Sequence, residues 1–231
     1  MMLPYQLVLP FKRQPNYRED SWIQDSCNQE ATQWIQRWPD WPRPRIICLY
    51  GETGSGKTHL SQIWLARTRG QVLSAQQTGH SSPYTLLKDN ANVLLEKADT
   101  LMDEEWLFHF YNYLQETQKY ALLTAHKPPS QWGVRLPDLY SRLQTIIAIE
   151  ITRPEEKALH AIMLNQFQQR GLNVKPEVVD YVLKHCERSF AAVTAWVQKL
   201  DHLAASQGRS ITIPLIRNAL GEDGGGIIMP Q

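Results

Sequence analysis

The sequence has almost no excess of charge of either sign, since 24 Lys and Arg residues stand against 23 Asp and Glu residues. Proteins that read nucleic acid over a broad surface usually carry a basic excess, so we expect no direct sequence-specific DNA binding. Only three cysteines occur, Cys27, Cys48 and Cys186, too few and too scattered for a disulfide framework or a cysteine metal site. No secretory signal is recognisable, and no apolar run approaches the roughly 20 residues of a membrane helix. We therefore expect a cytoplasmic protein with no membrane partner.

What the sequence does contain is an alternation of short apolar runs and helical segments, which is typical of a parallel α/β sheet. Five runs are predicted to be strands: Arg45–Tyr50, Gln71–Ala75, Asn92–Glu96, Tyr120–Ala125 and Thr145–Glu150. Helices are predicted at Ser26–Trp38, Lys57–Arg67, part of 82–89, Asp103–Glu116 and Asp138–Leu143. The predicted fold class is α/β, with a parallel five-stranded sheet as its core.

After Arg153-Pro154 the alternation stops, and helical periodicity continues to about Leu220. This pattern predicts an all-helical lid behind the sheet domain. The expected organisation is an extended N-terminal arm (1–20), an α/β nucleotide-binding domain (21–152), a helical lid domain (153–222) and a flexible Gly-rich tail (223–231).

A phosphate-binding motif follows the first predicted strand directly and precedes a predicted helix. The pattern G-x-x-x-x-G-K-[ST] is matched by Gly51, Glu52, Thr53, Gly54, Ser55, Gly56, Lys57 and Thr58. Glycines let backbone N–H groups surround phosphates, and the helix N-terminus adds its positive end. Lys57 is expected to reach the phosphates and Thr58 to ligate Mg²⁺. We predict ADP or ATP with Mg²⁺ as cofactors, and we include His59 among the nucleotide-contacting residues.

An acidic residue at the end of a later strand commonly supports Mg²⁺ in such sites. The run Asn92–Glu96 ends in Glu96, which we predict as both a metal and a catalytic residue. A second acid that orients the attacking water is expected directly after Glu96. Lys97 stands at that position instead, and Asp99 is three residues past Glu96. The sequence therefore favours nucleotide binding and a weak ATPase, and whether the chain is an enzyme on its own nucleotide stays open.

Several segments together resemble DnaA-related AAA+ proteins, which join a P-loop sheet domain to a helical lid. They are 22–28 ahead of the P-loop, 122–129 (LLTAHKPP) and 136–143 (LPDLYSRL). The resemblance implies that Ile23 and Asn28 lie near the adenine and that Arg142 is a catalytic arginine finger acting on a neighbouring subunit. His126 stands at the sensor 1 position of the family, and its role is open.

The lid departs from the family pattern at the sensor 2 position, where an Arg normally reads the nucleotide. That position falls near Ala191, which cannot make the contact. Arg188 lies one turn earlier, and we include it in the predicted nucleotide site as a substitute, although a helix-surface role is equally open.

Both ends of the chain are similar to the Hda type within this family, the regulators that inactivate the replication initiator DnaA. The chain stops at the lid, and it begins with a hexapeptide, residues 6–11, that resembles a sliding-clamp binding motif. Its expected clamp-binding residues are Gln6, Leu7, Leu9, Pro10 and Phe11. The resemblance implies two partners, the β subunit sliding clamp of DNA polymerase and DnaA, and a bacterial, nucleoid- or replisome-associated location. Homo-oligomer formation stays open.

The implied function is to dock on the clamp and promote hydrolysis of DnaA-bound ATP. Two alternatives stay open. One is a helicase-loader-like ATPase that uses its own ATP turnover, and the other is a DnaA-binding adaptor without effect on hydrolysis.

Overall fold

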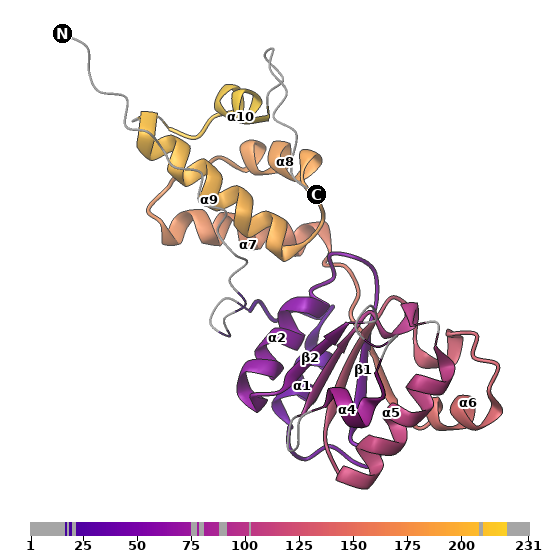
Figure 1. Cartoon of the computed structure of the whole chain (residues 1–231). Coiled ribbons are helices and arrows are strands. Elements are labelled where there is room, and N and C mark those ends of the chain that lie inside the picture. Colours follow the sequence, from indigo (N-terminus) through magenta and orange to yellow (C-terminus); the bar gives the residue numbers. More distant parts are fainter. Residues whose placement is uncertain are drawn as a thin grey trace.

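The computed structural model of the 231-residue chain describes Tyr17, Glu19, 22–74, Thr78, 81–87, 92–101, 103–207 and 210–220. The predicted clamp-binding residues Gln6, Leu7, Leu9, Pro10 and Phe11 lie outside the described residues, as does the predicted tail 223–231. The described residues form a sheet domain followed by a group of helices, the lid (Figure 1).

The sheet has five strands, all parallel, in the order β2-β3-β4-β1-β5. The strands are β1 (Ile46–Tyr50), β2 (Gln71–Ser74), β3 (Val93–Glu96), β4 (Ala121–Ala125) and β5 (Ile147–Glu150). Because all strands are parallel, their carboxyl ends meet at one edge, where α/β proteins bind ligands. The predicted α/β fold with a parallel five-stranded sheet is confirmed.

Helices cover both faces of the sheet, as Figure 1 shows. On one face lie α1 (Gln29–Gln36) and α2 (Lys57–Thr68), and on the other α4 (Pro83–Leu86), α5 (Glu104–Thr117) and α6 (Pro137–Leu143). Side chains alternate along a strand, so Ile47 and Leu49 of β1 pack toward α1 and α2, while Cys48 packs toward α5. Burial on both faces explains why the strands are continuous apolar runs.

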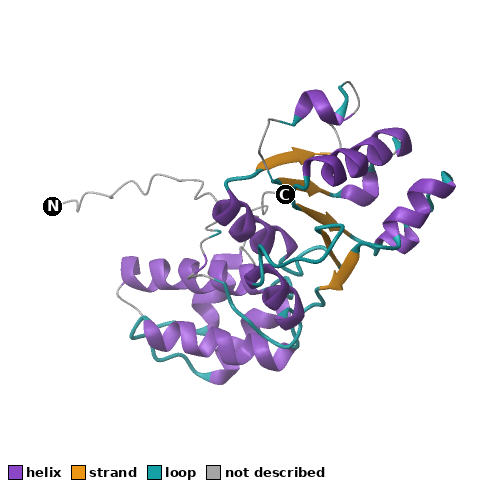
Figure 2. Ribbon diagram, turned by 90° about the horizontal axis from the view of Figure 1, so that it is seen from below, coloured by secondary structure: helices purple, strands orange, loops and turns teal. Residues whose placement is uncertain are grey.

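The lid consists of α7 (Glu156–Gln169), α8 (Pro176–His185), α9 (Phe190–Gln207) and α10 (Ile213–Leu220). Its buried residues form a cluster of their own, separate from the two clusters of the sheet domain. Met163 of α7, Val179 of α8 and Val197 of α9 are all fully buried in it. Figure 2 shows these helices grouped beside the sheet. Among the described residues, no helix is long and apolar enough to cross a membrane.

One predicted helix is shorter in the structure. The helix predicted at Ser26–Trp38 begins only at Gln29, because the buried Asn28 side chain holds the preceding residues in a loop. The helix predicted in part of 82–89 is confirmed as the single turn Pro83–Leu86, and Leu87 is already extended. Two 3₁₀ helices, Ala98–Thr100 and Pro129–Gln131, were not predicted.

Candidate nucleotide site

The phosphate-binding loop lies between the end of β1 and the start of α2, at the carboxyl edge of the sheet. Gly51, Gly54 and Gly56 have positive φ angles of 144°, 82° and 102°. A Cβ atom at Gly51 would stand 2.2 Å from the carbonyl oxygen of Ile151, so a side chain is excluded there. Only glycine combines this backbone conformation with so close an approach. The loop thus has the shape of a cradle for phosphate.

Lys57 is the first residue of α2, and its ammonium group reaches back over the loop. Its Nζ donates to the carbonyl oxygens of Gly51 and Glu52, both at 2.8 Å, and lies 3.3 Å from Ser55 Oγ. Burial lowers the pKa of Lys57, and the negative charge of Asp99 opposes that shift. A half-buried ammonium beside the loop's N–H groups and the α2 N-terminus fits a nucleotide phosphate chain. Thr58 follows with an exposed side chain, which suits a Mg²⁺-ligating hydroxyl.

The segment 22–28 lies against this loop and the start of α2. The ring of Trp22 is 3.3 Å from the position of a Cβ on Gly56 and packs edge-on against His59, with ring centroids 5.2 Å apart. Asn28 donates from Nδ2 to the carbonyl of Ile23 at 2.9 Å and accepts the N–H of Asp25 at 2.9 Å. The Asn28 amide therefore shapes the segment that carries Ile23. Ile23 and Asn28 remain predicted nucleotide contacts.

One turn of the lid, between α8 and α9, also reaches the loop. A Cβ on Gly54 would be 2.0 Å from Oε1 of Glu187 and 3.6 Å from Cβ of Ser189. Arg188, between them, points elsewhere: its Nη2 donates to Glu156 of α7 at 3.0 Å, and its side chain is 62% exposed. The lid thus brings a carboxylate to the phosphate loop, while the contact predicted for Arg188 stays a prediction. Sequence reasoning missed Glu187, because only the packing of the lid on the loop distinguishes it.

Two acidic residues follow the core of β3. Glu96 ends the strand opposite Ser74 of β2, with its side chain half-buried. Asp99 lies in the 3₁₀ helix behind it and accepts hydrogen bonds from His126 at the end of β4. The sequence singled out Glu96, whereas Asp99 is the acid whose charge acts on Lys57.

Arg142 lies near the end of α6 and rests on two aromatic rings of α5. Its guanidinium carbon is 4.3 Å from the ring centroid of Phe108 and 5.3 Å from that of Tyr111. The Thr145 hydroxyl donates to the carbonyl of Arg142 at 2.7 Å, so the Tyr111 hydroxyl, 3.1 Å from Thr145 Oγ1, must be the donor in that pair. These contacts place the guanidinium on α5, on the opposite face of the sheet from α2.

The fold is similar to those of solved replication initiators. Domain III of DnaA from Thermotoga maritima matches with a TM-score of 0.67 at 16% identity, covering 90% of this chain and 97% of that one. AMPPCP-bound DnaA from Aquifex aeolicus matches with a TM-score of 0.68 at 22% identity, covering 91% and 70%. The RuvB branch migration motor of T. maritima matches with a TM-score of 0.59 at 15% identity, covering 84% and 69%.

The lid has the more specific match, because residues 155–220 fit the family model described as "Hda, lid domain". The lid is therefore similar to the Hda lid domain, and the chain has the fold of the DnaA structures. The sheet domain carries the P-loop, and the match to the Hda lid covers α7, α8, α9 and α10.

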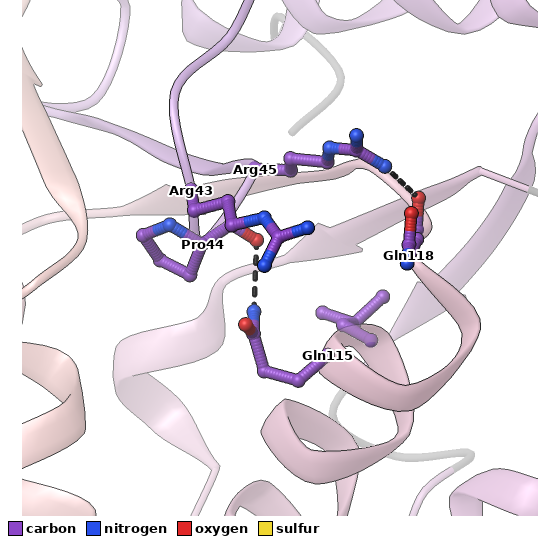
Figure 3. Close-up of a pocket in the computed structure, with 6 residues that line it drawn as sticks. Arg43, Pro44, Arg45, Gln115 and Gln118 are labelled. Atoms are coloured by element: carbon purple, nitrogen blue, oxygen red, sulfur yellow. Dashed lines mark hydrogen bonds between the residues drawn. The ribbon is translucent and has the colours of Figure 1, made fainter.

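A small pocket lies at the opposite end of β1, away from the P-loop (Figure 3). Its lining groups already bond to one another: Arg45 Nη1 donates to the carbonyl of Gln118 at 2.8 Å, and Gln115 Nε2 donates to the carbonyl of Pro44 at 2.9 Å. We interpret this pocket as structural. Among the described residues, no group of three His, Cys, Asp or Glu side chains is arranged to hold a metal ion. A Mg²⁺ at the P-loop would instead rely on Thr58, one acid and the nucleotide phosphates.

Proposed function

We propose that this chain is a DnaA-related AAA+ protein of the Hda type, which binds an adenine nucleotide and regulates replication initiation by promoting hydrolysis of ATP bound to DnaA. The observation that carries the proposal is the placement of Arg142, whose guanidinium rests on Phe108 and Tyr111 of α5. An arginine finger that acts on a neighbouring subunit must project away from the P-loop of its own chain. The contacts with Phe108 and Tyr111 hold Arg142 on α5, away from that loop. An arginine finger typically accelerates nucleotide hydrolysis 10³–10⁵-fold by stabilising transition-state charge.

The ADP or ATP bound by this chain itself would be held by the P-loop amides and Lys57. Thr58 and an acidic side chain would support the Mg²⁺. When bound, the nucleotide would supply phosphate charge for the Lys57 ammonium and the backbone N–H groups of the loop. The support is the positive-φ glycine loop and the Lys57 ammonium turned back over it. We propose that the chain keeps this nucleotide bound and hydrolyses it only weakly.

The proposed partners are DnaA and the sliding clamp, at the nucleoid in the bacterial cytoplasm. Clamp docking is supported by the resemblance of residues 6–11 to a clamp-binding motif, which lies outside the described residues. Changing Gln6→Ala together with Leu7→Ala should abolish clamp binding in a pull-down, while Asn16→Ala, outside the hexapeptide, should leave it unchanged. Full clamp binding by the double variant would show that the N-terminal arm does not mediate docking on the clamp.

The central experiment measures phosphate release from ATP preloaded on DnaA, with clamp-loaded DNA present. Wild-type protein should accelerate release, and Arg142→Ala should lower the rate toward that of DnaA alone. Arg135→Ala is the matched control, because Arg135 is an exposed arginine on the loop leading to α6. If Arg142→Ala stimulated phosphate release as strongly as the wild type, Arg142 would not be the arginine finger. The alternative of a DnaA-binding adaptor without effect on hydrolysis would then be favoured.

A second candidate, a helicase-loader-like ATPase, is favoured by an acid, Asp99, whose charge acts on Lys57. Asp99 is close enough to influence the pKa of that lysine, so the phosphate site does not lack an acidic group. Robust DNA-stimulated ATP turnover by the purified protein alone would support this candidate. Turnover that appears only with DnaA would contradict it.

A further inference from the structure

The amino ends of the strands form a second edge of the sheet, opposite the edge that carries the P-loop. Four strands begin there in register, with paired first residues: Gln71 of β2, Val93 of β3, Ala121 of β4 and Ile46 of β1. Neighbouring strands of a sheet lie about 4.8 Å apart, so this row spans roughly 14 Å from β2 to β1. Residues that lead into these strands therefore stand along one line.

Basic residues lead into three of these four strands. Arg45 directly precedes β1, Lys119 comes two positions before β4, and Arg69 comes two positions before β2. The segment between α1 and β1 contributes two more, Arg37 and Arg43. We call these five residues the basic edge.

The segment between α1 and β1 is held against the start of β4 by ring contacts. The ring of Trp38 packs edge-on against that of Tyr120, with ring centroids 6.0 Å apart. The guanidinium carbon of Arg45 is 5.3 Å from the Tyr120 centroid, and Nη1 of Arg45 donates to the carbonyl of Gln118 at 2.8 Å. Figure 3 shows Arg43 beside Arg45, with both side chains extending in the same direction. The arginines before β1 therefore lie next to the residues that lead into β4.

Few carboxylates balance the basic edge. The described segments that form it are 37–45, 68–70 and 116–120. Its five basic residues stand against two carboxylates in these segments, Asp40 and Glu116, although the whole chain has 24 basic and 23 acidic residues. Arg43 and Arg69 are exposed, and no arginine of the basic edge pairs with a carboxylate within the described part of the chain. Arginines elsewhere do form such pairs: Arg67, Arg153, Arg170 and Arg188.

We propose that the basic edge binds the phosphate backbone of duplex DNA without reading its sequence. A row of cations along one line matches a linear polyanion, and a planar guanidinium can bind two phosphate oxygens at once. The basic edge lies at the opposite end of the strands from the P-loop. This DNA contact therefore goes beyond the proposed function, and it requires neither a bound nucleotide nor DnaA.

An acidic protein surface is the competing partner for a row of cations. The core of a protein–protein interface is enriched in aromatic and apolar side chains. The exposed large apolar side chains among the described residues are Tyr17, Val72, Tyr84 and Tyr140, and none of them lies in segments 37–45, 68–70 or 116–120. The basic edge offers charge without such an apolar core, which favours DNA over a protein.

The test is fluorescence anisotropy of a labelled DNA duplex of mixed sequence, titrated with the full-length protein at several salt concentrations. If about four phosphates are neutralised, the dissociation constant should rise about 100-fold between about 50 and 200 mM salt. Arg43→Ala together with Arg69→Ala removes two phosphate contacts. The slope of log affinity against log salt should then fall by about two, and binding at low salt should weaken about tenfold or more.

Two further double variants separate the position of the charge from its amount. Lys157→Ala together with Lys184→Ala removes two exposed cations from the lid and should keep the wild-type affinity and salt slope. Arg43→Lys together with Arg69→Lys keeps both charges and should keep most of the slope. Equal losses in the lid variant and in the arginine-to-alanine variant would show that only net charge matters, and would overturn the proposal. Thermal unfolding of each variant establishes that it is folded.

Three other results would contradict the proposal. One is a wild-type protein that does not bind the duplex at low salt. Another is competition by saturating ADP with Mg²⁺, because it would place the DNA at the P-loop. The third is tighter binding of poly-glutamate than of the duplex, lost in the arginine-to-alanine variant, which would assign the basic edge to an acidic protein.

Discussion

At the residue scale, Glu187 is the side chain that most changes the expected chemistry of the site. The resemblance to DnaA-related proteins implies a positive sensor near Ala191 of α9, whereas the lid turn of this chain brings a carboxylate against Gly54 and Arg188 forms an ion pair with Glu156. A negative group at the phosphate loop repels phosphate, and the repulsion grows with the charge of the nucleotide. We therefore expect Glu187 to favour a nucleotide with fewer phosphates.

Neutralising this carboxylate should strengthen nucleotide binding. For Glu187→Gln we expect affinity to rise about 3–10-fold for ATP and less for ADP, as follows from roughly 1 kcal/mol of Coulomb energy for partly exposed charges a few ångströms apart. The affinities are measured by titration with each nucleotide in Mg²⁺ buffer. Glu177→Gln in α8 is the control, since it also removes one exposed lid carboxylate. Equal gains for ADP and ATP, or none, would argue against this role of Glu187.

At the element scale, α5 organises the surface that presents the proposed finger. Its rings carry the Arg142 guanidinium, and Glu104 in its first turn accepts backbone N–H groups of Arg135 and Leu136 at 2.8–3.1 Å. One helix thus fixes both the loop that leads into α6 and the arginine near its end. The rings of Phe108 and Tyr111 restrict the conformations of a long side chain, and this restriction reduces the entropy that Arg142 loses when it binds.

Removing a ring should weaken the finger without removing its charge. Phe108→Leu is expected to lower the stimulation of phosphate release from DnaA-bound ATP by about 3–10-fold, in line with the 0.5–1 kcal/mol or more of an exposed cation–π contact. Tyr84→Leu, an exposed tyrosine on α4, serves as the comparison. Equal activity of Phe108→Leu and wild type would show that stacking does not matter for the finger.

The Glu104 anchor predicts a dependence of stability on pH. Hydrogen bonds from the backbone of Arg135 and Leu136 lower the pKa of Glu104 below its ordinary value of 4.5. A lowered folded-state pKa contributes stability that is present above the unfolded-state pKa and lost as the pH falls through the folded-state pKa.

Thermal unfolding of wild type and Glu104→Gln should therefore differ most at neutral pH and converge in acid, as the pH falls through the lowered pKa of Glu104. Glu105→Gln, the neighbouring exposed carboxylate on α5, gives the comparison. A difference between wild type and Glu104→Gln that grows toward acid pH would contradict the assigned sign.

At the scale of the whole molecule, two bodies with separate cores meet at the P-loop. The sheet domain has two apolar clusters, one on each face of the sheet, and the lid has its own. Polar contacts connect them near the P-loop, where Glu187 lies on Gly54 and Arg153, after β5, pairs with Glu52 at 2.7 Å. A ligand bound here touches the junction, so it should stabilise the molecule as a unit.

Removal of nucleotide should therefore lower the unfolding temperature. At an ADP concentration of 100 times the Kd, binding to the folded state contributes about 2.7 kcal/mol, which corresponds to roughly 5–10 °C for a chain of this size. Differential scanning calorimetry before and after removal of nucleotide measures the shift. Lys57→Ala should show no shift, and Lys119→Ala, away from the loop, should show the wild-type shift. A wild-type shift in Lys57→Ala would place the ligand elsewhere.

Much of this molecule was predictable from its sequence, because the relevant signals are local. The P-loop spacing, the apolar runs of the five strands and the helical periodicity after Arg153 each depend on residues close together in the chain. Strand ends were predicted within about two residues, and errors gathered where a side chain overrides local propensity, as Asn28 does at the start of α1.

The site itself depends on contacts that no local pattern reveals. Asp99 reaches His126 only because β3 and β4 are neighbours in the sheet, and Glu187 reaches Gly54 only because the lid packs on the loop. Arg142 finds its rings on α5, 31 and 34 positions back along the chain. The sequence by itself determined the elements and the phosphate motif, since these follow from short-range sterics and periodicity. The tertiary structure decided which charges lie around the P-loop, since strand order and lid packing bring distant residues within reach of one another.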